Sequence, residues 1–162
     1  MGNFFSNIFI KIIFFVVLVV FSSFLFYSCG EDSSPIVDPN TPTEPILQTT
    51  AIDISDGDTF SIYYKNQKWK VRVLYVDCFE TSKGNRLTEQ ARKAGISVDS
   101  ALALGLKAKE FAKKTLLNKK VELHRDYKEP NLDTYGRLLR VTYIEGKRYD
   151  SLLKVLGLAV PE

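Results

Sequence analysis

The chain has 162 residues, 45% of them hydrophobic, with two cysteines and a formal net charge of +3 at pH 7. This length fits one domain of ordinary size, and two cysteines exclude a disulfide-rich scaffold. The charge is uneven, because residues 51–162 hold 21 Lys and Arg against 15 Asp and Glu, a net +6, whereas residues 30–50 hold four acids and no base. A cationic domain suits a polyanionic partner, although a solvated surface explains the charge alone equally well.

Residues 1–28 predict a signal peptide of the lipoprotein type. The run from Ile12 to Tyr27 is largely apolar and falls short of the ~20 residues that a spanning helix needs. Ser28 and Cys29 end this run in a way that resembles the bacterial lipoprotein signal, which implies cleavage before Cys29, lipidation of its sulfur and a membrane-anchored lipoprotein of the bacterial envelope. A plain secretory signal and an uncleaved membrane anchor are the alternatives.

Residues 29–50 predict the lipidated cysteine and a flexible linker. The segment contains four prolines and four acids, so it is too polar to form a core and is stiffened by proline. With Cys29 assigned to the export signal, the domain expected at residues 51–162 keeps one thiol, Cys78, and no internal disulfide.

The domain opens with three predicted strands. Ile52 and Ile54 alternate with polar residues within 51–55, which indicates the first strand. Residues 59–64 and 69–76 are rich in β-branched and aromatic residues and flank a short polar break, so they predict a hairpin that folds about Asn66 and Gln67.

This hairpin brings acidic residues together at one open end. Asp77 returns to the end where Asp56 and Asp58 begin, and Glu80 follows just beyond. Two unit charges about 4 Å apart repel by roughly 4 kcal/mol at an effective dielectric constant near 20. A Ca²⁺ ion, which accepts irregular shells of carboxylate, carbonyl and water oxygens, relieves such repulsion. Taken alone, Asp56-Gly57-Asp58 is also a common turn sequence.

The rest of the chain predicts helices and two more strands. A short helix is expected at 88–94, capped by Thr88 and stopped by Gly95, and a longer helix runs from Ser97 or Asp99 to about Leu117. The apolar stripe expected on the longer helix contains Leu102, Leu106, Phe111, Thr115 and Leu116, opposite a solvated lysine face.

Strands are expected at 121–124 and 138–144, followed by a short helix from Asp150 to Leu156. The single histidine, His124, has no triad partner nearby and is interpreted as structural. Together these elements predict an α+β fold: a small five-stranded Greek-key β-barrel of the OB type with two to three helices, an architecture that often binds nucleic acid.

Three blocks of the sequence stand out by their order and spacing: Asp56-Gly57-Asp58-Thr59, Arg72 with Val76-Asp77 and Glu80-Thr81, and Asp133-Thr134-Tyr135-Gly136-Arg137. Together they resemble the staphylococcal nuclease (thermonuclease) family over roughly residues 51–160. Their shared order and spacing are far more specific than any one block. The resemblance independently implies the barrel.

The resemblance also implies the site residues. Ca²⁺ is expected on the carboxylates of Asp58 and Asp77 and the backbone carbonyl of Cys78. The residues expected to be catalytic or to contact substrate are Arg72, Glu80, Arg137 and Tyr135. Glu80 would accept a proton from the attacking water or orient it, and the two arginines would grip the phosphate. Because Arg72 and Asp77 are an odd number apart, a bend near Tyr75 is required to bring them together.

The implied function is Ca²⁺-dependent hydrolysis of DNA and RNA by a membrane-tethered monomer, with little sequence preference, 3′-phosphate-ended products and no protein partner evident. A non-catalytic nucleic-acid-binding module and a structural Ca²⁺-binding lipoprotein are the alternatives. Three departures bear on the choice. Cys78 and Phe79 replace the family's Thr-Pro, the segment from Thr81 to Lys107 is longer, and the sequence ends at Glu162 where the namesake continues with stacking tyrosines and a helix. Each stacked base is worth roughly 1–3 kcal/mol, so weaker substrate affinity is expected.

Overall fold

The computed structural model describes residues 40–161. The expectations for the signal peptide at 1–28 and for Cys29 lie outside the described residues. The elements, in chain order, are β1 (Ile46–Ile54), β2 (Thr59–Tyr64), β3 (Gln67–Val73), α2 (Asn85–Ala94), α3 (Val98–Leu116), β4 (Lys120–His124), β5 (Leu138–Ile144), β6 (Lys147–Arg148) and α4 (Tyr149–Val155).

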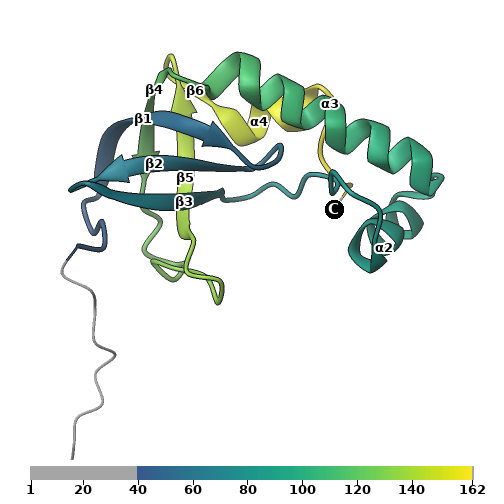
Figure 1. Ribbon diagram of the computed structural model, residues 1–162, viewed down its shortest axis with the longest axis horizontal. Helices are drawn as coiled ribbons and strands as arrows, with labels where there is room; N and C mark the ends of the chain where they lie inside the picture. The colour runs from purple at the N-terminus through teal and green to yellow at the C-terminus, as the bar shows by residue number, and fades with distance from the viewer. Residues whose placement is uncertain (1–39, 162) are drawn as a thin grey trace, which may run out of the picture. The chain divides into compact units, whose positions relative to one another are not determined.

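Strands β1 to β5 close into a barrel, which confirms the predicted fold class. β1 pairs antiparallel with both β2 and β4, β2 pairs with β3, and β4 pairs with β5. A short parallel pairing of β3 with β5, from Val71 opposite Leu138 to Val73 opposite Arg140, closes the circle. The short strand β6 extends the sheet beyond β5, and the helices lie toward one end of the barrel (Figure 1).

The predicted hairpin forms, but its two-residue turn is Lys65-Asn66 rather than Asn66-Gln67, because Gln67 already pairs with Tyr64. Lys65 and Asn66 both have positive φ, 47° and 62°, as the tight turns that match strand twist require. The register places Thr59 opposite Arg72, so Asp58 lies beside the end of β3. β3 ends at Val73 rather than at Val76, because Tyr75 adopts a φ of 64° and bends the chain. The predicted bend near Tyr75 is confirmed.

The first strand begins earlier than expected. β1 starts at Ile46 instead of 51, so residues 46–50, expected to be linker, are strand. These residues pair with β4 from Ile46 opposite His124 to Thr50 opposite Lys120. Upstream, Thr41 is buried, and the Pro42 carbonyl accepts a hydrogen bond from the fully buried Arg140 side chain over 2.8 Å. Residues 46–50, which directly follow the proline-rich segment, therefore belong to the barrel and pair with β4.

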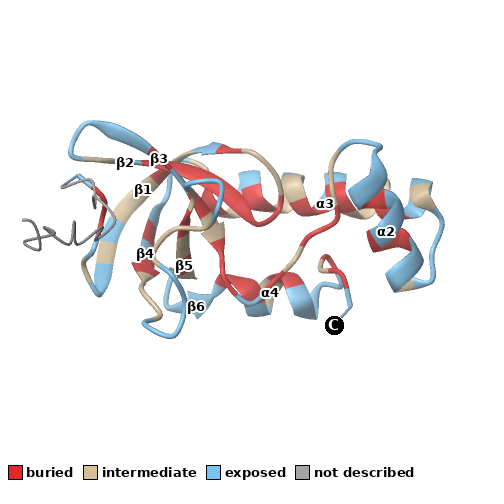
Figure 2. Cartoon of the chain, turned by 90° about the horizontal axis from the view of Figure 1, so that it is seen from below, coloured by how far each residue is buried: buried red, intermediate tan, exposed pale blue. Residues whose placement is uncertain are grey.

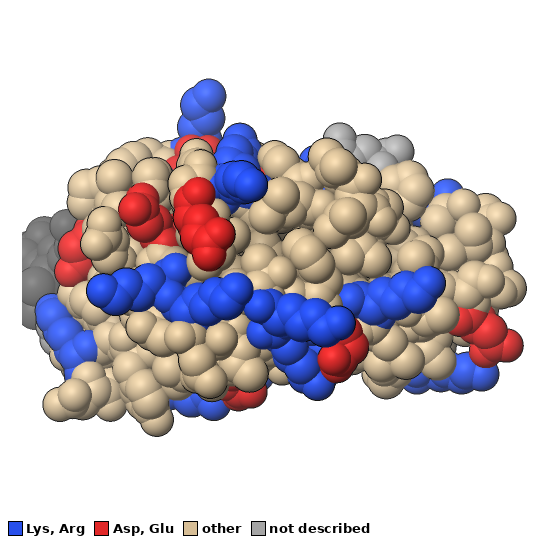
Figure 3. Space-filling view, turned by 90° about the horizontal axis from the view of Figure 1, so that it is seen from above, with Lys and Arg blue, Asp and Glu red and all other residues tan. Residues whose placement is uncertain are grey.

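Helix α3 packs mainly through small residues, and the predicted apolar stripe is confirmed at Leu116, Phe111 and Leu102 but wrong at Leu106. Leu106 is 47% exposed, whereas the buried residues of the helix are Ala101, Gly105, Ala108, Ala112 and Leu116. The buried stripe of α3 is visible in Figure 2. Small side chains let the helix backbone approach the barrel closely. The opposite face carries lysines as predicted, and a row of Lys and Arg crosses the face of the molecule over which α3 runs (Figure 3).

The helix ends differ in detail from the predictions. Ser97 caps α3 by accepting a hydrogen bond from the Ser100 amide, and Gly95 ends α2 in the left-handed region, both as predicted. α2 begins at Asn85, so Thr88 lies inside the helix instead of capping it. Asp150 does not cap α4, because its buried carboxylate pairs with the Arg148 guanidinium over 2.8 Å.

Two clusters of buried side chains hold these parts together. The larger fills the barrel and the inner faces of α3 and α4, and includes Phe60, Ile62 and Tyr149. The smaller lies between α2 and α3 and contains Phe79, Leu87 and Val160, so the loop after β3 is anchored on both sides. Within residues 40–161, every helix is too short or too polar to cross a bilayer.

Candidate active site

Asp58 lies at the floor of the candidate site. A tight turn precedes β2, in which the Asp58 amide donates to the Asp56 carboxylate over 3.1 Å. The buried Asp58 carboxylate accepts hydrogen bonds from the Thr59 hydroxyl over 3.1 Å and from the Cys78 amide over 2.6 Å. Asp58 therefore ties the start of β2 to the loop that follows β3.

Arg72 joins the two predicted metal-binding carboxylates. Its guanidinium pairs with Asp58 and, over 2.8 Å, with Oδ1 of Asp77. Asp77 reaches the same side as Arg72 because the chain bends at Tyr75. The structure thus resolves the odd spacing between Arg72 and Asp77.

Burial raises the pKa of Asp58 to about 7. The neighbouring Arg72 guanidinium opposes this shift, whereas the Asp56 carboxylate adds to it. Loss of hydration on burial thus outweighs the attraction of the Arg72 guanidinium and favours the protonated form of this carboxyl.

The third sequence block, residues 133–137, forms a turn that holds Tyr135 and Arg137 at the site. Asp133 accepts from the amides of Tyr135 and Arg137, both over 2.9 Å, and from Nε of Arg137 over 2.6 Å. Although partial burial acts to raise it, these hydrogen bonds keep the pKa of Asp133 below its usual value. Gly136 has a φ of 74°, which the turn requires and glycine adopts readily. The Arg137 guanidinium lies over the Tyr135 ring, 5.3 Å from its centroid.

Residues from all three sequence blocks line one cavity of about 320 Å³. The predicted residues that line it are Asp58, Arg72, Asp77, Cys78, Glu80, Tyr135 and Arg137. Asp56, Lys70, Phe79 and Arg86 complete its walls. The structure therefore brings together every predicted site residue that it describes, while the role of each stays a prediction. Within residues 40–161, no three His, Cys, Asp and Glu side chains gather as a metal-binding cluster.

Comparisons with known proteins assign the family. Residues 70–161, which include much of this cavity, match the family model described as staphylococcal nuclease homologue. The chain belongs to the staphylococcal nuclease family. The match excludes the first predicted block, which lies before residue 70.

Curated relatives agree with this family. Endonuclease YncB of Bacillus subtilis is 31% identical over 122 residues, which cover 75% of this chain and 51% of the relative. Thermonuclease of Staphylococcus intermedius is 34% identical over 106 residues, which cover 65% of this chain and 54% of the relative. An uncharacterized protein of Methanocaldococcus jannaschii is 36% identical over 96 residues, which cover 57% of this chain and 46% of the relative. This chain therefore spans about half the length of the curated relatives it matches.

Helix α2 brings two residues to this nuclease-family site that sequence reasoning missed. The first is Gln90, whose buried side chain donates from Nε2 to Oδ2 of Asp77 and to the Cys78 carbonyl, both over 3.0 Å. Its Oε1 accepts from the Glu80 amide over 2.9 Å. One amide group thus contacts two predicted metal ligands and the backbone of the predicted base.

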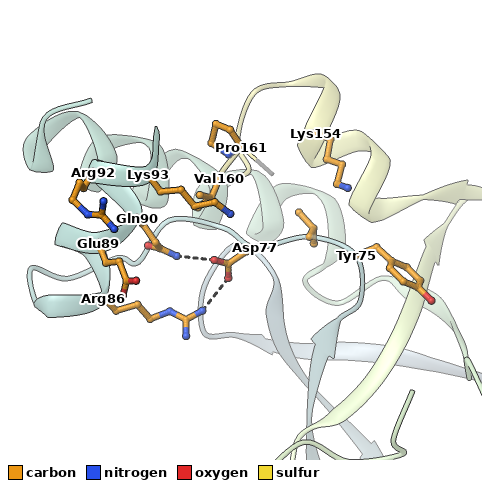
Figure 4. A pocket seen from close by; sticks show the side chains of 11 residues that line it. Tyr75, Asp77, Arg86, Glu89, Gln90, Arg92, Lys93, Lys154, Val160 and Pro161 are labelled. Atoms are coloured by element: carbon orange, nitrogen blue, oxygen red, sulfur yellow. Dashed lines mark hydrogen bonds and ion pairs between the residues drawn. The ribbon is translucent and has the colours of Figure 1, made fainter. Parts of the chain in front are cut away.

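The second is Arg86, one helical turn before Gln90. Its guanidinium lies 3.0 Å from Oδ1 of Asp77 and 2.6 Å from Oε1 of Glu80. Figure 4 shows Arg86 and Gln90 reaching Asp77 from the same helix. A spacing of four residues on α2 places both side chains on one face. Because the sequence predicts a helix in this segment only at 88–94, Arg86 lies outside that prediction and no sequence signal joins the two residues.

Glycine 105 sets how closely α3 approaches the loop that carries Glu80. A Cβ built on Gly105 would lie 2.6 Å from the Phe79 carbonyl oxygen and in collision with the Glu80 carbonyl. Both are backbone atoms, so neither can move without moving the loop. The position of Glu80 therefore depends on the absence of a side chain on α3.

Proposed function

We propose that this chain is a Ca²⁺-dependent nuclease that hydrolyses phosphodiester bonds of DNA and RNA with little sequence preference. The observation that carries the proposal is the convergence of Arg72, Glu80 and Arg137 with two carboxylates in one cavity. Membership of the staphylococcal nuclease family supports it, as do relatives whose names are endonuclease and thermonuclease. Products ending in a 3′-phosphate follow from the family resemblance.

The donor set fits calcium by its chemistry. Asp58, Asp77 and the Cys78 carbonyl offer oxygen atoms alone, which is the ligand class that Ca²⁺ prefers. Asp58 and Cys78 are already held together by the hydrogen bond between them. When bound, the ion would polarise a phosphate oxygen and neutralise developing charge.

The protein's own side chains would do the remaining work. Glu80, on the loop held by Gln90, would accept a proton from the attacking water or orient that water. Arg72 and Arg137 would bind the phosphate oxygens with planar guanidinium groups, and these contacts strengthen as charge develops. Both arginines pair with carboxylates here, so substrate phosphates would have to share or replace the contacts with Asp58, Asp77 and Asp133.

The test is cleavage by the full-length chain in neutral detergent. Plasmid, single-stranded DNA and RNA are incubated with Ca²⁺ or with a chelator, and products are separated by electrophoresis. We expect cutting of all three with Ca²⁺ and none with chelator. Cutting that persists in chelator contradicts the metal dependence. Nucleic acid that is retarded but uncut supports a non-catalytic binding module instead.

We also propose that residues 1–28 are removed and that Cys29 carries lipid, which would tether a monomeric nuclease to a bacterial membrane. The support is the sequence pattern alone. Mass spectrometry of protein purified from membranes would show a mature chain beginning at Cys29 with added acyl mass. A chain without that mass gain refutes the anchor.

A further inference from the structure

A second cavity lies against the candidate site. It has a volume of about 500 Å³ and is bordered by α2, α4, the bend at Tyr75 and the last described residues, Val160 and Pro161. Asp77 and Arg86 line both this cavity and the site cavity, so the two are adjacent. In Figure 4, side chains from these separate segments surround the same space. A cavity of this size can hold a nucleotide.

The charge of the second cavity suits phosphate groups. Four cations line it, Arg86, Arg92, Lys93 and Lys154, against two carboxylates, Asp77 and Glu89. Arg86 is already paired with Asp77. Arg92 and Lys93 are exposed and have no ion pair within residues 40–161. Those two cations can therefore bind phosphates without first breaking an ion pair.

Tyr75 gives the cavity an aromatic wall. Tyr75 is 43% exposed, and its hydroxyl donates to the Asp126 carboxylate, which fixes the ring's far end. The Arg148 guanidinium lies over the ring, 5.5 Å from its centroid, so a stacked base would use the other ring face. A φ of 64° is unusual for a bulky residue, and with this backbone bend Tyr75 lines the edge of the cavity, its ring pointing away from Asp77 in Figure 4. Sequence-independent binding of single strands combines such aromatic platforms with cationic grooves.

We propose that this second cavity binds single-stranded nucleic acid next to the cleaved linkage, with a base stacked on Tyr75 and phosphates on Arg92 and Lys93. The inference rests on the proposed function for the identity of the substrate, and it assigns a subsite outside the predicted catalytic and metal-binding residues. The lysine row along α3 is a weaker candidate, because it shares no lining residue with the site cavity.

The test measures binding apart from cleavage. A fluorescent 12-nucleotide single strand is titrated with the full-length chain in neutral detergent and chelator, and anisotropy is recorded at several salt concentrations. The double variant Arg92→Gln, Lys93→Gln removes two cations from the cavity. The matched control, Lys107→Gln with Lys114→Gln, removes two exposed cations from α3. Tyr75→Ala removes the ring, and circular dichroism confirms that each variant is folded.

Loss of two phosphate contacts should reduce the slope of log affinity against log salt by about 1.4, and the affinity at 0.1 M salt by about 25-fold relative to 1 M salt. Tyr75→Ala should weaken binding by about five- to a hundredfold. The α3 control should bind like the unmodified chain. Equal losses in both double variants, or no loss in either, overturn the subsite.

Cleavage assays on the same samples separate this inference from the proposed function. Binding that depends on Arg92 and Lys93 without any cleavage supports the subsite and contradicts the proposed nuclease activity. If the Arg92→Gln, Lys93→Gln variant cleaves and also binds like the unmodified chain, the nuclease activity is supported and the subsite is contradicted. A chain that neither binds nor cuts nucleic acid removes both.

Discussion

The Gln90 side chain donates a hydrogen bond from α2 to Oδ2 of Asp77 over 3.0 Å. The same Nε2 atom contacts the Cys78 carbonyl, and the Glu80 amide bonds to Oε1. Because Gln90 is buried, no water can replace these contacts without rearrangement. The glutamine thus fixes the distance between predicted metal ligands and the predicted base.

Replacing Gln90 by alanine should weaken Ca²⁺ binding by about 10- to 100-fold, because groups that orient metal ligands have effects of that size. Isothermal titration with Ca²⁺ measures this directly, without any turnover. Glu89→Ala is the matched control, since Glu89 precedes Gln90 and is exposed. Unchanged Ca²⁺ affinity in Gln90→Ala would show that the glutamine does not position the ligands.

Replacing Arg86 by alanine should have the opposite effect on the metal. The Arg86 guanidinium lies beside Asp77 and Glu80, so its removal takes away a positive charge that repels a cation. We expect Ca²⁺ affinity to rise by about three- to tenfold, given the screening of an exposed charge. Arg92→Ala, on the same helix without contact to Asp77, should leave the affinity unchanged. Weaker Ca²⁺ binding in Arg86→Ala would contradict the assignment of Asp77.

The Gly105→Ala substitution should destabilise the domain and slow cleavage together. The added methyl group collides with the backbone of Phe79 and Glu80, and such overpacking costs about 1–3 kcal/mol. Urea unfolding and initial cleavage rates measure the two effects. Gly84→Ala is the matched control, because nothing lies within 4 Å of its added Cβ and its backbone is extended. If Gly105→Ala matches the Gly84→Ala variant in both measurements, the close approach is not needed.

A chain that begins at residue 51 should be much less stable than one that begins at residue 40. The shorter chain loses the pairing of residues 46–50 with β4 and leaves buried Arg140 without the Pro42 carbonyl. Net values of about 0.5–1.5 kcal/mol per hydrogen bond suggest a total loss of about 3–5 kcal/mol. Urea denaturation of the two chains compares them, and equal midpoints would mean that residues 40–50 contribute nothing.

Some of the fold could be predicted because local patterns agreed with the final packing. The hairpin follows from strand alternation and a polar turn, and Ser97 and Gly95 carry the usual chemistry of helix ends. The predicted start of β1 is too late: residues 46–50 are grouped with the proline-rich segment that precedes them, although Ile46, Thr49 and Thr50 favour a strand and pair with β4. The packing of α3 was predicted incorrectly at Leu106. Hydrophobicity predicts that Leu106 is buried, whereas the close approach of the helix to the Glu80 backbone requires Gly105 in the buried face.

The site residues likewise fall into those that the sequence predicts and those that it does not. Asp58, Arg72, Asp77, Glu80 and Arg137 stand in ordered blocks, so their convergence could be predicted from spacing and family resemblance. Arg86 and Gln90 lie between the second and third sequence blocks, and no block marks them. Their contact with Asp77 depends on how α2 packs through Leu87 and Ala91, which the sequence alone does not reveal.

The most direct measurement is the initial rate at which the Glu80→Gln variant cleaves a labelled single-stranded oligonucleotide at saturating Ca²⁺. Loss of general-base catalysis predicts a fall of about 10²- to 10⁴-fold relative to the unmodified chain. Glu110→Gln, an exposed substitution on α3, should retain the full rate. Cleavage by Glu80→Gln at the rate of the unmodified chain would contradict the assignment of this cavity as the active site.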